Sequence, residues 1–174
     1  MPTNAVIFAR ALLALDEAGV IGRSECKAAV KIFIRQASED SLWNLSTHYR
    51  SKAAAEIIRK AIADGKIRSR SQYHSFCKKK ENQLRHEHMV PGEVVYSLIL
   101  AIGRPSVLAY ARVLRKTGFR ATITVAEDKQ LLRDSMPGDR NDYRSSDFHL
   151  SRYIDKNLHA SLEQRPPNGW YGEA

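Results

Sequence analysis

The stretch Ala121-Thr122-Ile123-Thr124-Val125 contains the clearest strand signal in this chain of 174 residues. Four of its five residues are β-branched, and such side chains favour an extended backbone over a helix. The segment 126–133 follows at once and carries Glu127 and Asp128, acidic residues of the kind found in the first turn of helices. We therefore expect a strand that leads directly into a short helix.

Helical patterns account for most of the remaining chain. Each expected helix has a capping residue, a stop residue or an apolar stripe at helical spacing. The expected helices run from Asn4 to a stop at Gly19, from Ser24 onward, from Tyr49 to Asp64 before Gly65, from near Ser71, over 94–102, from Ser106 to Gly118, and from Asp147. This pattern predicts an α+β fold that is mainly α-helical with a small β element.

The composition excludes several classes of protein. Hydrophobic residues make up 43% and charged residues 27%, a balance typical of a folded chain. Cys26 and Cys77 are the two cysteines and form no CxxC motif, which excludes a disulfide framework and a cysteine-based zinc finger. The longest apolar run, 94–102, is too short to span a membrane, and the first residues lack a signal-peptide pattern. We therefore expect a cytoplasmic protein with no membrane partner.

Positive charge is concentrated in one part of the chain. Lys and Arg number 28 against 19 Asp and Glu, and the formal net charge is +9. The window 50–85 holds eleven basic and three acidic residues, so +8 of that charge lies there. Basic clusters of this kind neutralise phosphates without reading base sequence. The residues expected to contact nucleic acid are Arg50, Arg59, Lys60, Lys66, Arg68, Arg70, Lys78, Lys79, Lys80 and Arg85.

The three consecutive residues His86, Glu87 and His88 form the segment best suited to chemistry, and Pro91 follows them. Hydrolysis of a phosphodiester needs a base that activates water and a cation that stabilises the leaving oxygen. An imidazole can act as the base near neutral pH, and a carboxylate suits the hard cation Mg²⁺. The alternative interpretation of this segment is a polar turn between two helices.

The run Glu87-His88-Met89-Val90-Pro91 resembles the opening motif of the HNH, or ββα-metal (His-Me finger), endonucleases. The resemblance implies that Glu87 binds a metal ion and that His88 is the general base. It also implies a second strand and then a helix with a further metal ligand. The strand 121–125 and the segment 126–133 fit that order, with Asp128, rather than Glu127, at the position of the helical ligand. The strand is then expected to pair with the segment around 85–89.

The chain departs from the family pattern in two places. Two expected helices separate the motif from the second strand, and Asp128 stands where the family usually has His or Asn. A second assignment of the metal ligands uses Asn141 and His149, whose spacing resembles that of the Asn and His in the family name. It ranks second because Asn141 lies in a Pro-Gly loop with no strand before it.

These observations predict a small Mg²⁺- or Mn²⁺-dependent endonuclease that acts on DNA, with RNA as the other candidate substrate. By family analogy, such a protein would serve in restriction, in phage or plasmid biology, or as a toxin. The expected regions are a basic helical platform over 1–82, an HNH-like region over 83–160 and a flexible tail over 161–174. The alternative function is a non-catalytic regulator or inhibitor that binds nucleic acid. In that case Glu87 and His88 would have no catalytic role. The alternative interpretation of the basic window itself is a solvated helix face with its aromatic residues in the core.

Overall fold

The computed structural model describes residues 4–37, 48–131, 133, 135–137, 143 and 145–164, without the side chains of Arg70 and His74. The chain forms two compact units, and each unit is assembled from three separate stretches of sequence. Unit 1 comprises Met1–Asn44, His88–Phe119 and Leu132–Arg152, and unit 2 comprises Leu45–Glu87, Arg120–Leu131 and Tyr153–Ala174. The units are thus interleaved in sequence, unlike the continuous regions expected above.

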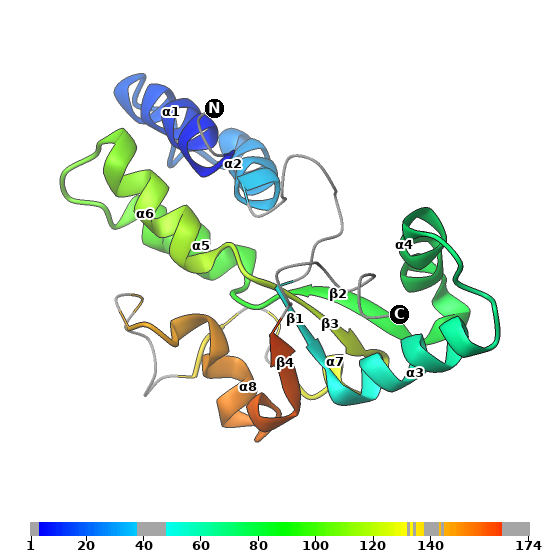
Figure 1. Ribbon diagram of the computed structural model, residues 1–174. Coiled ribbons are helices and arrows are strands. Elements are labelled where there is room, and N and C mark those ends of the chain that lie inside the picture. Colours follow the sequence, from blue (N-terminus) through cyan, green and yellow to red (C-terminus); the bar gives the residue numbers. More distant parts are fainter. Residues whose placement is uncertain are drawn as a thin grey trace. The chain divides into compact units, whose positions relative to one another are not determined.

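Unit 1 is helical. Its main helices are α1 (Asn4–Glu17), α2 (Ser24–Ala37), α5 (Gly92–Leu100) and α6 (Val107–Thr117), which Figure 1 shows together. Their apolar stripes meet in one core that includes Leu12, Val30, Ile99 and Leu114. Gly19 ends α1 with a backbone φ of +68°, a conformation that favours glycine. The sequence pattern therefore predicted these helices correctly, because each buries a stripe at helical spacing.

Unit 2 is built around a four-stranded sheet with the order β2-β3-β1-β4. The strands are β1 (Tyr49–Ser51), β2 (Leu84–His88), β3 (Arg120–Thr124) and β4 (Leu162–Gln164), and the last residue of β2 belongs to unit 1. Strand β1 runs parallel to β3 and antiparallel to β4. The expected pairing of 121–125 with the segment around 85–89 is confirmed, because β3 lies beside β2.

The strands β2 and β3 run antiparallel. The amide of Met89 donates to the carbonyl of Phe119 at 3.0 Å, beyond one end of the pair. The amide of Val125 donates to the carbonyl of Gln83 at 2.8 Å, beyond the other end. A higher residue number on one strand thus pairs with a lower number on its neighbour, which defines the antiparallel direction.

Three side-chain caps start the helices of unit 2, which are α3 (Lys52–Ala63), α4 (Arg70–Lys78) and α7 (Val125–Asp128). Ser51, Ser69 and Thr124 each accept a hydrogen bond from a backbone amide three residues later, as capping residues do. A second apolar cluster, which includes Ala54, Ile58, Ala61, Tyr73, Cys77 and Leu84, joins α3 and α4 to β2. Helix α8 (Ser151–Asp155) begins in unit 1 and ends in unit 2.

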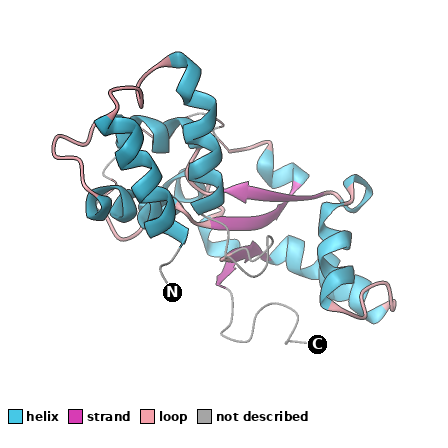
Figure 2. Ribbon diagram, turned by 90° about the horizontal axis from the view of Figure 1, so that it is seen from above, coloured by secondary structure: helices cyan, strands magenta, loops and turns pink. Residues whose placement is uncertain are grey.

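The structure confirms the α+β class and changes several boundaries. The helix expected from Tyr49 begins at Lys52, because residues 49–51 form β1. The helix expected over 126–133 is shorter and ends at Asp128. The expected loop over 136–146 lies partly outside the described residues, and the part of the expected tail after Gln164 lies wholly outside them. Figure 2 shows the resulting predominance of helices over strands.

No helix within the described part of the chain is both long enough and apolar enough to cross a membrane.

Candidate functional site

The motif that begins at Glu87 occupies the end of a strand and the start of a helix. Glu87 and His88 are the last two residues of β2 and are half-buried. Met89 and Val90 are buried, and Pro91 is the N-cap residue of α5. The segment is therefore extended backbone with two apolar anchors behind it, and not the polar turn considered as the alternative.

His86 makes a contact across the sheet. Its Nδ1 lies 3.0 Å from the Oγ1 of Thr122 on β3. Successive side chains of a strand point to opposite faces, so Glu87 lies on the face opposite to His86 and His88. The contact with Thr122 gives His86 a partner that holds β2 to β3.

His88 lines a cavity of about 220 Å³ within unit 1. The other lining residues are Lys31, Ile34, Arg35, Val90, Gly92, Glu93, Val95, Thr117 and Gly118. The guanidinium of buried Arg152 donates to the carbonyl of His88 at 3.0 Å, which fixes the backbone at this position. The imidazole therefore stands beside basic side chains on a backbone that is held in place.

The charged residues of this cavity were not predicted as site residues. Lys27, Lys31 and Arg35 are spaced four residues apart, so they lie along one face of α2. Glu93 forms an ion pair with Lys27 at 3.2 Å and another with Lys31. Hydrogen bonds from Lys31 and Lys27 lower the pKa of Glu93 from its ordinary value. The four-residue spacing is the signal that would have found the basic residues.

Helix α7 separates the roles of two adjacent acidic residues. Glu127 Oε2 accepts hydrogen bonds from the Thr124 amide at 2.8 Å, the Thr124 hydroxyl at 2.9 Å and the Ser51 hydroxyl at 2.7 Å. Glu127 thus completes a capping box and ties α7 to the start of α3. Asp128, the last residue of α7, is half-buried and lies in unit 2 with Glu87. The three hydrogen bonds of Glu127 therefore give it a structural role in unit 2.

No group of three or more His, Cys, Asp or Glu side chains among the described residues is placed to hold a metal ion. Of the second-choice ligands, Asn141 lies outside the described residues. His149 is buried and stacks on Phe119, with ring centroids 3.9 Å apart and an interplanar angle of 17°. Its ring therefore packs in unit 1.

Most of the expected nucleic-acid contacts are exposed on unit 2. Two of these exposed side chains are those of Arg59 and Lys79, each 60% exposed. The other exposed members of the set are Lys60, Lys66, Arg68, Lys78, Lys80 and Arg85. The side chain of Arg70 lies outside what the structure describes. We call the eight exposed residues the basic set.

Arg50 differs from the rest of the expected contacts, because its side chain is only 2% exposed. Its Nη2 lies 3.2 Å from the Oε2 of Glu163 on the neighbouring strand β4. The buried Tyr73 and Cys77 lie close to Arg50, and burial raises the pKa of the Tyr73 phenol and raises that of the Cys77 thiol to about 12. Arg50 therefore holds the sheet together instead of facing solvent, and Cys77 is not an activated thiol.

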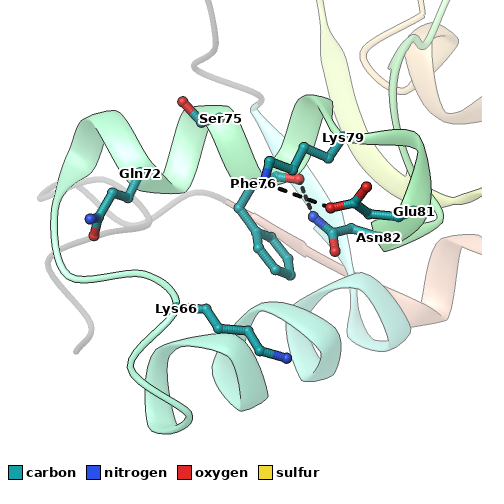
Figure 3. A pocket seen from close by; sticks show the side chains of 7 residues that line it. All are labelled: Lys66, Gln72, Ser75, Phe76, Lys79, Glu81 and Asn82. Atoms are coloured by element: carbon teal, nitrogen blue, oxygen red, sulfur yellow. Dashed lines mark hydrogen bonds and ion pairs between the residues drawn. The ribbon is translucent and has the colours of Figure 1, made fainter.

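A second cavity, of about 560 Å³, lies within unit 2. Its lining comes from the turn that follows α3, from α4 and from the short helix after α4 (Lys80–Asn82), as Figure 3 shows. The lining residues are Lys66, Gln72, Ser75, Phe76, Lys79, Glu81 and Asn82. Only the two lysines of this group were predicted as contacts, because an amide or an aromatic ring on a helix has no signal of its own in the sequence.

Comparisons of the chain with protein-family models, with curated proteins and with solved structures gave no match.

Proposed function

We propose that this protein is a metal-dependent endonuclease that hydrolyses phosphodiester bonds in DNA, in the cytoplasm. The observation that supports the proposal is the order of elements around Glu87 and His88. These two residues end β2, the antiparallel neighbour β3 lies beside them, and α7 follows β3 directly. Two antiparallel strands and then a helix form the order that the resemblance to HNH endonucleases implies.

The donor set fits a hard cation. Glu87 and Asp128 supply two carboxylates from β2 and α7 of unit 2. Mg²⁺ is typically held by one or two carboxylates and keeps several waters, so it does not need a cluster of three protein ligands. A bound Mg²⁺ or Mn²⁺ would supply stabilisation of the leaving oxygen.

His88 is the proposed general base. A neutral imidazole accepts a proton from water, which then attacks the phosphorus. Lys31 and Arg35 line the same cavity as His88, and their charges favour a phosphate there. The carbonyl of His88 is held by Arg152, so the ring stands on a fixed backbone. These contacts suit a residue whose position matters for proton transfer.

A cleavage assay tests the proposal. The protein is incubated with supercoiled plasmid and with RNA in Mg²⁺ or Mn²⁺, with EDTA as the control. His88→Ala should lower turnover by roughly 10²–10⁴-fold, the usual contribution of general acid–base catalysis. The matched control is His159→Ala, since His159 is exposed in the short helix His159–Ser161. The proposal fails if the parent cuts neither substrate with either metal, or if His88→Ala cuts as the parent does.

The second candidate function is a regulator or inhibitor that binds nucleic acid without cutting it. The exposure of the basic set favours this function as much as the first. The two functions differ at the proposed catalytic and metal-binding residues. A protein that only binds should tolerate His88→Ala, and it should bind DNA in EDTA without ever cutting it in Mg²⁺. Binding without cleavage in the assay above would select this candidate.

A further inference from the structure

The cavity of unit 2 combines an aromatic ring with positive charge. Phe76 on α4 is half-buried, and it packs on the apolar cluster between α3 and α4 while lining the cavity. Figure 3 shows its ring pointing from α4 toward α3, with the Lys66 side chain below the ring and the Lys79 side chain above it, near the end of α4. A ligand in this cavity would therefore meet a flat apolar surface and two ammonium groups.

We infer that this cavity binds one unpaired nucleotide of a single-stranded nucleic acid. A base stacks on an aromatic ring, and the lysines attract its phosphates. The volume of about 560 Å³ lies within the range of about 300–1,000 Å³ that is typical of ligand sites. The faces of paired bases are covered by their neighbours in a duplex, so only an unpaired base can stack on a ring that lines a cavity.

The polar residues of the lining suit the edge of a base. The Asn82 amide donates to the carbonyl of Phe76 at 2.7 Å, which fixes Asn82 beside the ring. Gln72 is held in a similar way, because its Oε1 accepts from the Arg68 amide at 2.6 Å. An ordered amide beside an aromatic ring, with a second ordered amide elsewhere in the lining, can hydrogen-bond to the edge of a base.

Glu81 is the one lining group that opposes a phosphate. Its carboxylate lies 3.7 Å from the Lys79 ammonium, and the two side chains are 74% and 60% exposed. An exposed pair at this distance is weak and yields readily to a competing anion. Lys66 forms a similar exposed pair with Asp64 at 3.7 Å. A phosphate can therefore bind these lysines at little cost in free energy.

This inference rests on the proposed function for the choice of nucleic acid as the ligand. Its test does not require cleavage. The full chain is titrated in EDTA against a short fluorescein-labelled single strand and against the matching duplex, with binding read as anisotropy. Phe76→Leu keeps the apolar packing and removes the aromatic face. It should weaken single-strand binding by about tenfold, the scale of one base–aromatic stack, and leave duplex binding unchanged.

Three further variants protect this test against misfolding. Phe76→Tyr keeps a stacking ring and should bind the single strand as the parent does. Lys79→Gln should weaken single-strand binding more than duplex binding, whereas Lys78→Gln, at an exposed neighbour outside the lining, should weaken the two equally. If Phe76→Leu does not fold, the Lys79 and Lys78 pair decides.

Three results would overturn the inference. The first is single-strand binding that Phe76→Leu leaves unchanged in a folded protein. The second is an equal loss of duplex and single-strand binding in Phe76→Leu or in Lys79→Gln. The third is saturable binding of adenosine monophosphate with no binding of the strand, which would assign the cavity to a free nucleotide. His88→Ala should bind the single strand normally, so a failed cleavage assay and a failed binding assay remain distinguishable.

Discussion

The two cavities use similar charges in different ways. In unit 1, Lys31, Arg35 and Glu93 surround His88, and Glu93 is fixed by ion pairs with two lysines. In unit 2, Lys66, Lys79 and Glu81 surround Phe76, and the Lys79–Glu81 pair is long and exposed. The first arrangement orders its charges around a group that can accept a proton. The second places its two lysines in longer, exposed ion pairs near an aromatic ring, which neither accepts nor donates a proton.

This difference suggests that binding and chemistry depend on separate groups. In the proposed function, attraction to nucleic acid comes from the basic set and from the cavity around Phe76, which belong to unit 2. The proposed role of His88 is to accept a proton and not to attract a phosphate. Variants should therefore lose one property without losing the other.

The largest expected effect concerns the two neighbouring acidic residues of α7. Asp128→Asn should lower cleavage by roughly 100-fold or more, since even partners outside the metal's own ligands contribute about 10–100-fold. Glu127→Gln should instead lower the free energy of unfolding by about 1–3 kcal/mol, because its Oε2 serves three hydrogen bonds. Metal titrations of cleavage and thermal unfolding distinguish the two. Equal cleavage by Asp128→Asn and the parent would remove Asp128 from the proposed site.

The second prediction asks whether attraction to DNA belongs to unit 2. Changing Lys78, Lys79 and Lys80 to Glu should make duplex binding less sensitive to salt. The slope of log K against log salt should become shallower by about three or more. The matched control changes three exposed arginines of unit 1 to Glu, and these are Arg10, Arg104 and Arg112. Anisotropy titrations across salt concentrations measure both slopes. A control that lost as much as the triple lysine variant would show that attraction is not confined to unit 2.

The third prediction concerns the buried charge that holds the sheet of unit 2. Glu163→Gln should destabilise the protein by about 1–3 kcal/mol, because it leaves the buried Arg50 without its carboxylate. Arg59 also pairs with Glu163, at 3.2 Å, but its side chain is 60% exposed. Arg59→Gln should therefore cost less than about 1 kcal/mol. Urea unfolding of both variants gives the two values, and similar values would contradict the structural role assigned to Arg50.

The smallest expected effect is the response of unit 1 to acid. The pKa of Glu93 is lower in the folded chain than its ordinary value of 4.5, so its ion pairs stabilise the fold above that pH. This stabilisation is lost as the pH falls below 4.5 toward the lower folded-state pKa. Glu93→Gln should flatten the fall in melting temperature over that range, and Glu81→Gln should not. If the melting temperature of Glu93→Gln falls with pH as that of the parent does, the ion pairs of Glu93 do not stabilise the fold.

Local patterns in the sequence predicted the helices and the central strand well. Ser106, for example, caps α6 as expected, and its hydroxyl accepts from the Ala109 amide at 3.1 Å. Such caps involve residues three apart, so they are visible in a short window. The same holds for the stop at Gly65, where the backbone φ is +70°.

Local patterns could not predict contacts between residues that lie far apart in the sequence. Strand β1 has three residues, too few for a periodic signal, and its pairing with β3 comes from a distant part of the chain. Strand β4 was missed for the same reason. Arg50 was counted among the exposed charges because its neutralising partner, Glu163, lies far away in sequence. At the candidate site, the motif located Glu87 and His88, but Lys31 and Glu93 reach the cavity only through folding.

The parallel pairing of β1 with β3 also sets the order in which the chain can fold. Tyr49 pairs with Ala121, about 70 residues later, and β2 needs the same strand as its neighbour. Helices α3 and α4 can form early from local contacts, but the sheet must wait until β3 is available, and such long-range closure slows folding. A growing or truncated chain that ends before Arg120 carries two strands with the place between them empty. Open strand edges pair with other chains, so these incomplete forms should aggregate before the full chain does.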